Sequence, residues 1–230
     1  MIQALPKRLE TIISMVPSSS VIADIGCDHA YISIALVARG IAASAIACDI
    51  NEGPLRSAQK NIREEKLSQK IETRLGDGLT PVSADEADTV IIAGMGGLLM
   101  KQILTGRLHD FKHFILSPQR DLPAFRRFLF DNDCFIQDEC MVEEDGKFYT
   151  VMHVCPAERH SAEQKAKADA LYQSEVELIY GGWNLEKKCA VLQRFLQKEQ
   201  TRYTAILRNT SAPDIVHANE LIHIALEAYQ

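Results

Sequence analysis

The chain has 230 residues, of which 47% are hydrophobic and 24% are charged, and its net charge is −6. This composition suits a globular protein with one full core and a smaller appendage. The acidic balance argues against indiscriminate nucleic-acid binding, although it leaves room for a local basic patch. No apolar run approaches the length of a membrane span, and the first eight residues lack the basic-then-apolar order of a signal peptide.

The six cysteines form no C-x-x-C pair and lie mostly in apolar runs, at Cys27, Cys48, Cys134, Cys140, Cys155 and Cys189. This usage predicts reduced, buried thiols in a cytoplasmic protein, with no metal and no membrane partner. The sequence does not set an oligomeric state, and a monomer is the working expectation.

Strand-like and helical segments alternate from Val21 to about Val154. Strands are predicted at residues 21–24, 43–49, 70–75, 89–93, 113–117, 134–141 and 148–155. Helices are predicted between the early strands, at residues 31–39, 53–66, 98–105 and 122–131. Alternating βα units favour a parallel sheet with helices on both faces, which is an α/β fold of the Rossmann-like kind.

The last two predicted strands are joined by the segment EEDGK at residues 143–147, which is a turn signal without room for a helix. We therefore expect an antiparallel hairpin at one edge of the sheet. By fold analogy, five parallel βα units ending in such a hairpin are typical of a class I methyltransferase sheet rather than a nicotinamide-binding one.

The composition shifts near Pro156, where β-branched runs give way to Ala, Glu, Gln, Lys and Leu. Residues 161–180 are predicted to be mostly helical, and Gly181-Gly182 to break them. Asn184 or a neighbour is predicted to cap a long helix that runs to about Arg208, and residues 215–228 form a third helix. We therefore predict two domains, residues 1–156 and residues 157–230, the second a helical hairpin or short coiled coil.

The segment DIGCDHAY at residues 24–31 lies between the first predicted strand and the first predicted helix. Such a strand-to-helix turn belongs at the carboxyl edge of a parallel sheet, where open α/β sheets bind nucleotides. A G-x-G-x-x-G fingerprint would need glycines where Asp28 and Tyr31 stand, and Asp28 would repel a pyrophosphate. A cofactor with an amino-acid tail and no phosphates, such as S-adenosylmethionine, fits better. The alternative is a capped turn without a ligand.

Four residues of this loop are candidates for binding that cofactor: Asp24, Gly26, Asp28 and His29. Gly26 would let the backbone approach the tail, and a nearby carboxylate would hold its amino group.

Two more acidic positions follow predicted strands. Asp49, with Ile50 beside it, ends the second strand, and an acid there can accept both hydroxyls of a ribose. Asp77 stands between Gly76 and Gly78, where it can reach the exocyclic amine of an adenine lying flat on the glycines. The alternatives are an N-cap aspartate and a plain Asp-Gly turn.

The segment GMGG at residues 94–97 ends the fourth strand. Gly94 and Gly96 provide a surface that a ligand can approach closely, and Met95 can pack on a flat ring. The turn carries no polar side chain. It therefore suits an acceptor atom that already has a free lone pair, such as a ring nitrogen.

Basic residues mark two further candidate surfaces. Arg120, after the fifth strand, could meet a phosphate, whereas Arg126 and Arg127 are more typical of a solvated helix face. At about 100° per residue, five basic residues share one side of the predicted long helix: Lys187, Arg194, Lys198, Arg202 and Arg208. This basic stripe is either a phosphate-binding surface or an ordinary solvated face.

Seven short segments, taken together and in order, resemble the bacterial tRNA (adenine-22-N1)-methyltransferases. They are LPKRL at 5–9, DIGCDHAY at 24–31, ACDI at 47–50, GDGL at 76–79, AGMGG at 93–97, LSP at 116–118 and GKFY at 146–149. Cys27 stands where the family often has Thr, and Ser117-Pro118-Gln119 replaces a Gln-Pro version. The resemblance covers residues 5–155, and beyond them it extends only to helical character.

The resemblance implies a Rossmann-like S-adenosylmethionine domain followed by a helical domain that contacts tRNA, and methyl transfer to N1 of adenine 22 in the D-arm. Its catalytic candidates are Asp28, which would stabilise developing charge, Met95 and Arg8. The tRNA would be held by Arg120 and by four residues of the basic stripe: Lys187, Arg194, Lys198 and Arg202. The rival functions are a catalytically idle RNA-binding module and a nicotinamide-dependent oxidoreductase.

Overall fold

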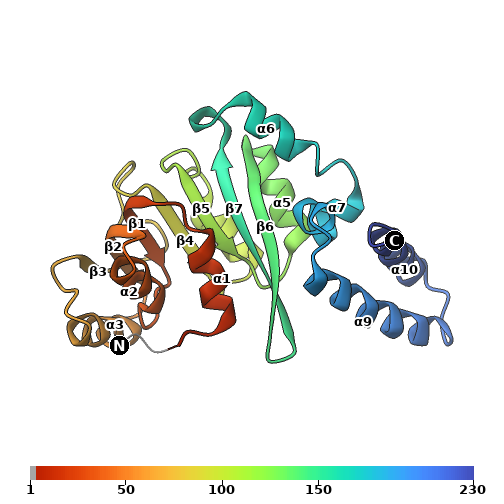
Figure 1. Ribbon diagram of the computed structural model, residues 1–230, viewed down its shortest axis with the longest axis horizontal. Coiled ribbons are helices and arrows are strands. Elements are labelled where there is room, and N and C mark those ends of the chain that lie inside the picture. Colours follow the sequence, from red (N-terminus) through yellow and green to blue (C-terminus); the bar gives the residue numbers. More distant parts are fainter. Residues whose placement is uncertain (1–3) are drawn as a thin grey trace.

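A computed structural model describes residues 4–230 and shows a seven-stranded sheet with helices on both faces (Figure 1). The strand order is β3-β2-β1-β4-β5-β7-β6, in which β1 to β5 are parallel and the last two strands are antiparallel. The strands are β1 (Ser19–Ile25), β2 (Ala42–Asp49), β3 (Ile71–Leu75), β4 (Thr89–Ala93), β5 (His113–Ser117), β6 (Cys134–Glu144) and β7 (Lys147–Pro156). The predicted α/β methyltransferase fold is confirmed.

Two apolar cores lie on the two faces of the sheet. In β4, Val90 and Ile92 point into one core with the apolar residues of α4 and α5, while Ile91 points into the other with those of α1, α2 and α3. Each strand therefore supplies both cores because its side chains alternate between the faces. These helices are α1 (Lys7–Met15), α2 (Tyr31–Ala38), α3 (Glu52–Glu64), α4 (Gly97–Leu104) and α5 (Leu122–Asp131).

The sequence analysis did not predict α1. Leu9, Ile12, Ile13 and Val16 nevertheless follow the i, i+3, i+4, i+7 spacing of an amphipathic helix, and the last three are buried. The helix packs against α2, β6 and β7, so it places the start of the chain beside the hairpin.

The predicted hairpin is confirmed. Asp145 and Gly146 join β6 to β7 with φ angles of 49° and 73°, and a two-residue hairpin turn favours positive φ at both positions. β7 lies between β5 and β6, so β6 forms the edge of the sheet.

Every element after β7 is helical: the 3₁₀ helix η1 (Ala157–Arg159), then α6 (Ala162–Asp169), α7 (Glu175–Tyr180), α8 (Gly182–Glu186), α9 (Ala190–Leu207) and α10 (Pro213–Glu227). Gly181, with a φ of 94°, separates α7 from α8 as predicted. The predicted start of the long helix is wrong, because Asn184 is buried inside α8 and Lys188, with a φ of 49°, interrupts the chain before α9. The division into two domains stays a prediction. Among residues 4–230, no helix is both long and apolar enough to span a membrane.

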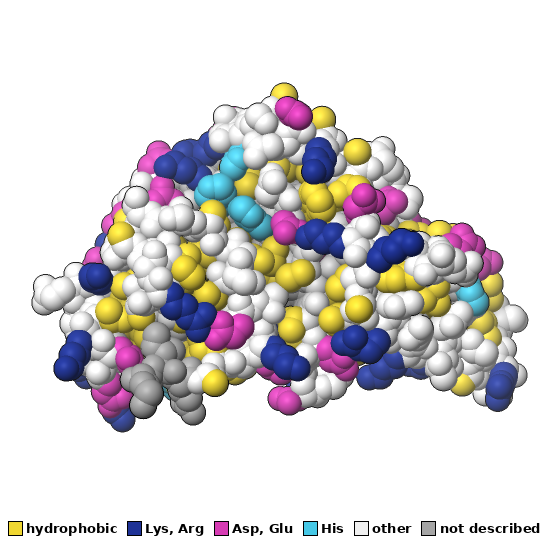
Figure 2. All heavy atoms as spheres, in the orientation of Figure 1, with side chains coloured by type: hydrophobic (Ala, Val, Ile, Leu, Met, Phe, Trp, Pro, Cys, Tyr) yellow, Lys and Arg dark blue, Asp and Glu magenta, His cyan; other side chains and the backbone are white. Residues whose placement is uncertain are grey.

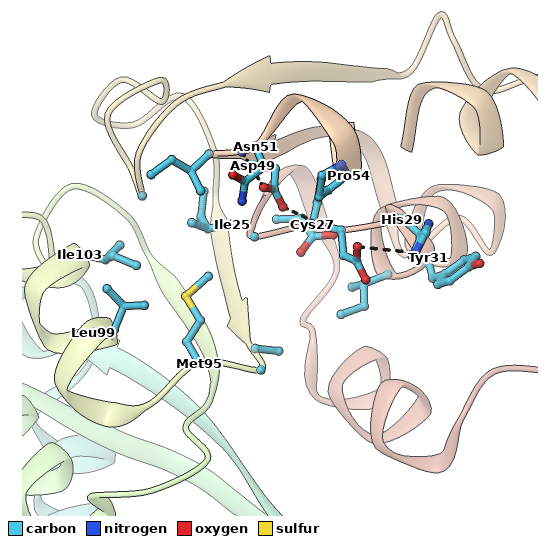
Figure 3. A pocket seen from close by; sticks show the side chains of 18 of the residues that line it. Ile25, Cys27, His29, Tyr31, Asp49, Asn51, Pro54, Met95, Leu99 and Ile103 are labelled. Atoms are coloured by element: carbon cyan, nitrogen blue, oxygen red, sulfur yellow. Dashed lines mark hydrogen bonds and ion pairs between the residues drawn. The ribbon is translucent and has the colours of Figure 1, made fainter. Parts of the chain in front are cut away.

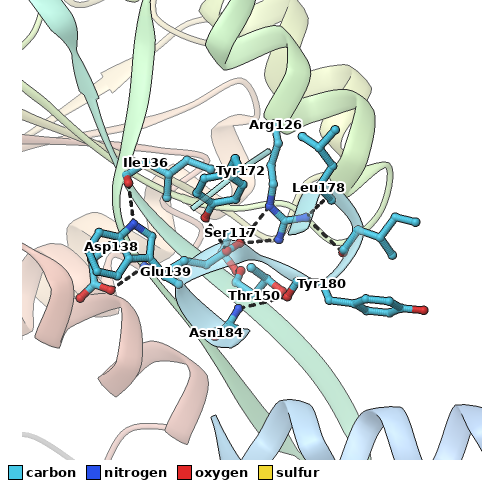
Figure 4. Close-up of polar contacts among 12 residues, drawn as sticks. Ser117, Arg126, Ile136, Asp138, Glu139, Thr150, Tyr172, Leu178, Tyr180 and Asn184 are labelled. Atoms are coloured by element: carbon cyan, nitrogen blue, oxygen red, sulfur yellow. Dashed lines mark hydrogen bonds and ion pairs between the residues drawn. The ribbon is translucent and has the colours of Figure 1, made fainter. Parts of the chain in front are cut away.

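A buried ion pair joins the helical region to the sheet (Figure 4). Arg126 of α5 and Glu139 of β6 pair with each other, and both side chains are fully buried. The guanidinium also donates to two backbone carbonyl oxygens of α7 at 2.6 and 3.1 Å, and the Tyr172 hydroxyl donates to the second Glu139 oxygen at 2.9 Å. The prediction of a solvated Arg126 is therefore wrong, because α7 covers that face of α5, whereas Arg127 is exposed as predicted.

Candidate active site

A cleft of about 650 Å³ opens at the carboxyl ends of β1 to β4 (Figure 3). Its walls come from the loops that follow these strands and from the start of α1 and α4. The predicted site residues that line it are Arg8, Asp24, Gly26, Asp28, His29, Asp49, Ile50, Asp77, Gly78, Gly94 and Met95. The topology thus brings together residues that are up to 87 positions apart in the sequence, from Arg8 to Met95.

The loop after β1 is a tight turn that depends on Gly26. Its backbone N–H donates to the Cys48 carbonyl oxygen at 2.9 Å, and its φ is +71°, which favours glycine. A Cβ at this position would lie 2.4 Å from the Met95 Cε, so a side chain could not fit without moving Met95. Asp28, with a φ of 50°, completes the turn and directs the chain into α2.

Asp24 places a buried carboxylate under this turn. It is 4% exposed, and within residues 4–230 its side-chain partner is the Ser33 hydroxyl, which donates at 2.8 Å. Burial raises the pKa of Asp24 to about 6, and the nearby negative charge of Asp49 adds to the rise. A cationic group in the cleft would relieve both effects.

Asp49, at the end of β2, is 8% exposed and ties two loops together. Its Oδ1 accepts from the Asn51 backbone N–H at 2.9 Å, and its Oδ2 accepts from the Asp28 N–H at 3.3 Å. Each of the two carboxylate oxygens can accept a further hydrogen bond, so Asp49 can also bind both hydroxyls of a diol. The N-cap position of α3 belongs to Asn51, not to Asp49.

Asp28 and His29 stand at the mouth of the cleft. The Asp28 side chain is 71% exposed, and its Oδ1 lies 3.6 Å from the His29 Nε2. The His29 ring stacks on Tyr31 with centroids 5.4 Å apart. These groups can therefore contact a large substrate that docks over the opening.

Apolar side chains that the sequence analysis missed form the opposite wall. Leu99 and Ile103 of α4 lie beside Met95, across the cleft from the loop of Asp49 (Figure 3). Ile50 and Leu99 are 59% and 46% exposed, which is unusual for large aliphatic side chains beside a site. They flank the loop of the exposed Asp77 with apolar surface that suits a flat ring. The available signal was the pair of leucines placed directly after the GMGG turn.

Gly96 and Arg120 lie outside the lining of the cleft. A Cβ on Gly96 would lie 3.3 Å from the Arg120 Nε, and the Gly97 N–H donates to the Arg120 carbonyl oxygen at 3.2 Å. Gly96 therefore departs from its predicted position in the cofactor site, because it packs against the loop after β5. Arg120 is exposed beside that packing contact.

Arg8 links the cleft to the hairpin. Its guanidinium lies 5.0 Å from the centroid of the Tyr149 ring on β7, and its backbone N–H is 3.3 Å from a carboxylate oxygen of Glu144. Within residues 4–230, its Nε is buried without a hydrogen-bond partner. Tyr149 itself was not predicted as a site residue.

The basic stripe is shorter than predicted: Arg194, Lys198 and Arg202 lie on α9 at four-residue spacing, but Lys187 falls outside this helix, which corrects its place in the stripe. Lys187 lies before α9 and pairs with an aspartate of β6. Arg194 pairs with a glutamate of β6 at 2.9 Å, and the Lys198 Nζ lies 5.5 Å from the centroid of a phenylalanine ring on β7. Arg202 stays near an acid of its own helix, 3.4 Å away. Three of these cations therefore lie against the hairpin.

Comparisons with known proteins agree with this geometry. The chain matches the methyltransferase domain family over residues 5–152. It is 35% identical to the tRNA (adenine(22)-N(1))-methyltransferase of Bacillus subtilis (strain 168) over 199 residues, which are 85% of this chain and 82% of the relative. A Streptococcus pneumoniae protein in complex with S-adenosyl-L-methionine is 31% identical, with a TM-score of 0.84 over 97% of this chain and all of the other.

An M. capricolum protein in complex with S-adenosyl-homocysteine is 26% identical, with a TM-score of 0.84 over 99% of this chain and all of the other. The family match, the sequence identity and the structural similarity indicate the same family. The chain belongs to the tRNA (adenine(22)-N(1))-methyltransferase family.

Proposed function

We propose that this protein transfers a methyl group from S-adenosylmethionine to N1 of adenine 22 in the D-arm of a tRNA, in the cytoplasm. The observation that carries the proposal is the arrangement of the cleft. Asp24, Asp49 and Asp77 lie at the carboxyl ends of three neighbouring strands and converge on one opening, while the loop after β1 carries Asp28 where a dinucleotide would place its pyrophosphate. Family membership supports the same reaction.

The cleft offers a separate partner for each part of the cofactor. The buried Asp24 carboxylate suits the cationic amino group of the methionine tail, and Gly26 lets the backbone lie against that tail. Asp49 suits the two ribose hydroxyls. Asp77 suits the exocyclic amine of adenine, with Leu99 on a wall beside it.

When bound, S-adenosylmethionine supplies an electrophilic methyl group on a sulfonium, which leaves as neutral thioether once the methyl is transferred. The protein therefore mainly aligns this methyl with the acceptor nitrogen. Gly94 and Met95 lie beside the first loop and offer no group that competes for the acceptor lone pair. Adenine N1 has a free lone pair at neutral pH, so no strong base is needed. The exposed Asp28 carboxylate stabilises the positive charge that develops on the ring.

The substrate base must leave its stack before N1 can reach the cleft, at a cost of a few kcal/mol. Arg8 supports this step, because its side chain lies at the cleft with an unpartnered Nε among the described residues and rests on an aromatic ring. The helical region and Arg120 supply contacts to the tRNA backbone on either side.

Nucleoside mass spectrometry tests the proposal. Folded tRNA treated with the protein and S-adenosylmethionine should yield 1-methyladenosine, and the same tRNA with guanine at position 22 should yield no product, because guanine N1 carries a proton. The Asp49→Ala variant is the matched control for the cofactor site. N6-methyladenosine, or equal methylation of the guanine tRNA, would contradict the proposal.

A further inference from the structure

A second group of ligand-type side chains lies at the other end of the sheet from the cleft. His113 is the first residue of β5, and since β5 runs parallel to β1, this end of the strand is opposite to the carboxyl edge. His153 and Cys155 belong to the last part of β7, and His160 follows η1. Figure 2 shows histidine side chains clustered on the surface in this part of the molecule.

The distances between three of these side chains match those of a tetrahedral metal site. The His113 Nδ1 lies 3.1 Å from the His153 Nε2, and the Cys155 Sγ lies 3.6 Å from each of them. Zinc–nitrogen bonds of about 2.0–2.1 Å and a zinc–sulfur bond of about 2.3 Å, at tetrahedral angles, place two nitrogens about 3.3 Å apart and nitrogen and sulfur about 3.6 Å apart. An ion therefore fits between the three atoms with little movement of the chain.

His160 is the candidate for the fourth ligand. It offers a ligand atom within 4.8 Å of those of His113 and Cys155. Its Nε2 is 3.2 Å from the Lys112 carbonyl oxygen, which leaves Nδ1 for a metal. A metal-bound histidine commonly donates its other N–H to a backbone carbonyl in this way.

The surroundings of these histidines differ from those of three others in the chain. His29, His109 and His217 each lie within 4.0 Å of a carboxylate, but among residues 4–230 no such pairing occurs for the three clustered histidines or for His223. Cys155 is fully buried.

We propose that His113, His153, Cys155 and His160 form a binding site for a divalent cation of the zinc class. On binding, the thiol releases its proton to solvent, and the imidazole that carries the N–H between the two rings changes tautomer, so that its proton moves to its other ring nitrogen. The thiolate and the neutral imidazole nitrogens then donate lone pairs to the ion. The ion fastens His160, and with it the segment that leads into α6, to strands β5 and β7. The site thereby replaces the sequence-based expectation of a protein without a metal.

Cobalt titration of the full chain tests this site. The protein is freed of metal with a chelator and titrated with Co²⁺, whose thiolate charge-transfer band and strong d–d bands report a tetrahedral site with a sulfur ligand. One equivalent should bind with both sets of bands, and Zn²⁺ should displace it. Cys155→Ser should lose the charge-transfer band, and Cys134→Ser, at another buried cysteine outside the cluster, should keep it.

A second variant separates coordination from a structural role. His160→Ala should keep the thiolate band but weaken Zn²⁺ binding by more than the roughly 10–100-fold that loss of a supporting residue causes. Zn²⁺ should also raise the melting temperature of the unmodified protein and not that of Cys155→Ser. No cobalt band in the unmodified protein, or the same bands and stoichiometry in Cys155→Ser, would overturn the proposal and leave a hydrogen-bonded cluster only.

Discussion

Buried charged side chains have different partners in the cleft and at the joint, where the helical region packs against the sheet. In the cleft, Asp24 and Asp49 are almost fully buried, yet their hydrogen bonds come only from a hydroxyl and from backbone N–H groups, and no cation pairs with them among residues 4–230. At the joint, Arg126 and Glu139 are buried together, with further partners for both. A buried charge is called compensated here when an opposite charge of the protein pairs with it. An uncompensated charge, as in the cleft, indicates a ligand site, whereas a compensated charge, as at the joint, holds elements together.

The largest effect should come from removing half of the buried pair. Glu139→Gln keeps the shape of the side chain but leaves the Arg126 guanidinium buried without its counter-charge, which should lower the free energy of unfolding by about 3–5 kcal/mol. Denaturant unfolding measures the loss. Arg127→Gln, on the exposed neighbour, should change it by no more than about 0.5 kcal/mol. Equal effects of the two variants would show that the buried pair does not hold the joint.

Substitutions in the cleft should change the affinity for S-adenosylmethionine more than the stability of the fold. Gly26→Val would force a side chain against Met95, and Asp49→Ala would remove a charged acceptor, so each should weaken S-adenosylmethionine binding at least about tenfold, or 1.4 kcal/mol. Calorimetry on the folded variants measures this change. Gly40→Val is the matched control, because its φ is also positive, at +69°, but no atom lies within 4 Å of its Cβ position. Unchanged affinity in both cleft variants would contradict the cofactor site.

Much of the sheet could be predicted because its signals are local. Strands β4 and β5 and helix α5 begin and end at the predicted residues, since an apolar run or an amphipathic turn bounded by polar residues fixes each of them. The start of the long helix could not be predicted in the same way. Asn184 has the local preference of a helix cap, but tertiary packing buries it inside α8.

The site residues also divide into those that local sequence signals predict and those that depend on tertiary packing. Acids at the ends of parallel strands must converge at one edge, so Asp24, Asp49 and Asp77 could be placed from the sequence. The contact between Arg8 and Tyr149 depends on how α1 packs against β7, which no local pattern contains. The histidine and cysteine cluster escaped notice because His153, Cys155 and His160, although close in the sequence, form no C-x-x-C spacing, and because His113 joins them only through the pairing of β5 with β7.

Because Asp24 has no counter-charge among the described residues, the stability of the fold and the affinity for the cofactor should depend on pH in opposite directions. Its pKa is raised from 3.8 to about 6 in the folded protein, so its contribution to stability is fully present below about pH 3.8 and is lost as the pH rises through 6. Cofactor binding needs the carboxylate, so affinity should be about fourfold weaker at pH 5.5 than at pH 7 for an acid with this pKa. Asp24→Asn should flatten both profiles, as measured by unfolding and by calorimetry. An unchanged affinity profile in Asp24→Asn would assign the titration to another group.

The smallest effect should come from the basic residues that lie against the hairpin. Arg194→Glu combined with Lys198→Glu should weaken tRNA binding and leave S-adenosylmethionine affinity unchanged, because both positions are outside the cleft. Arg194 already pairs with a glutamate of β6, and Lys198 lies over an aromatic ring. Because each cation already has a partner, its attraction to a tRNA phosphate is reduced. The salt dependence of binding should therefore fall by at most about one unit of slope per residue.

Binding of tRNA at several salt concentrations measures this change. Lys60→Glu combined with Arg63→Glu is the control, since it makes the same change in net charge at exposed positions of α3, which packs against β2 and β3, far from the hairpin in the strand order. If the tRNA affinity and its salt slope respond to the control and not to the first pair, the RNA-binding surface lies at the β3 edge of the sheet and not beside the hairpin. If only the first pair responds, the cations against the hairpin serve both the fold and the RNA. An exposed ion pair can exchange its carboxylate for a phosphate at little cost in free energy, whereas the buried Arg126 cannot. The difference between compensated and uncompensated charge would then be one of degree, set by how exposed the ion pair is.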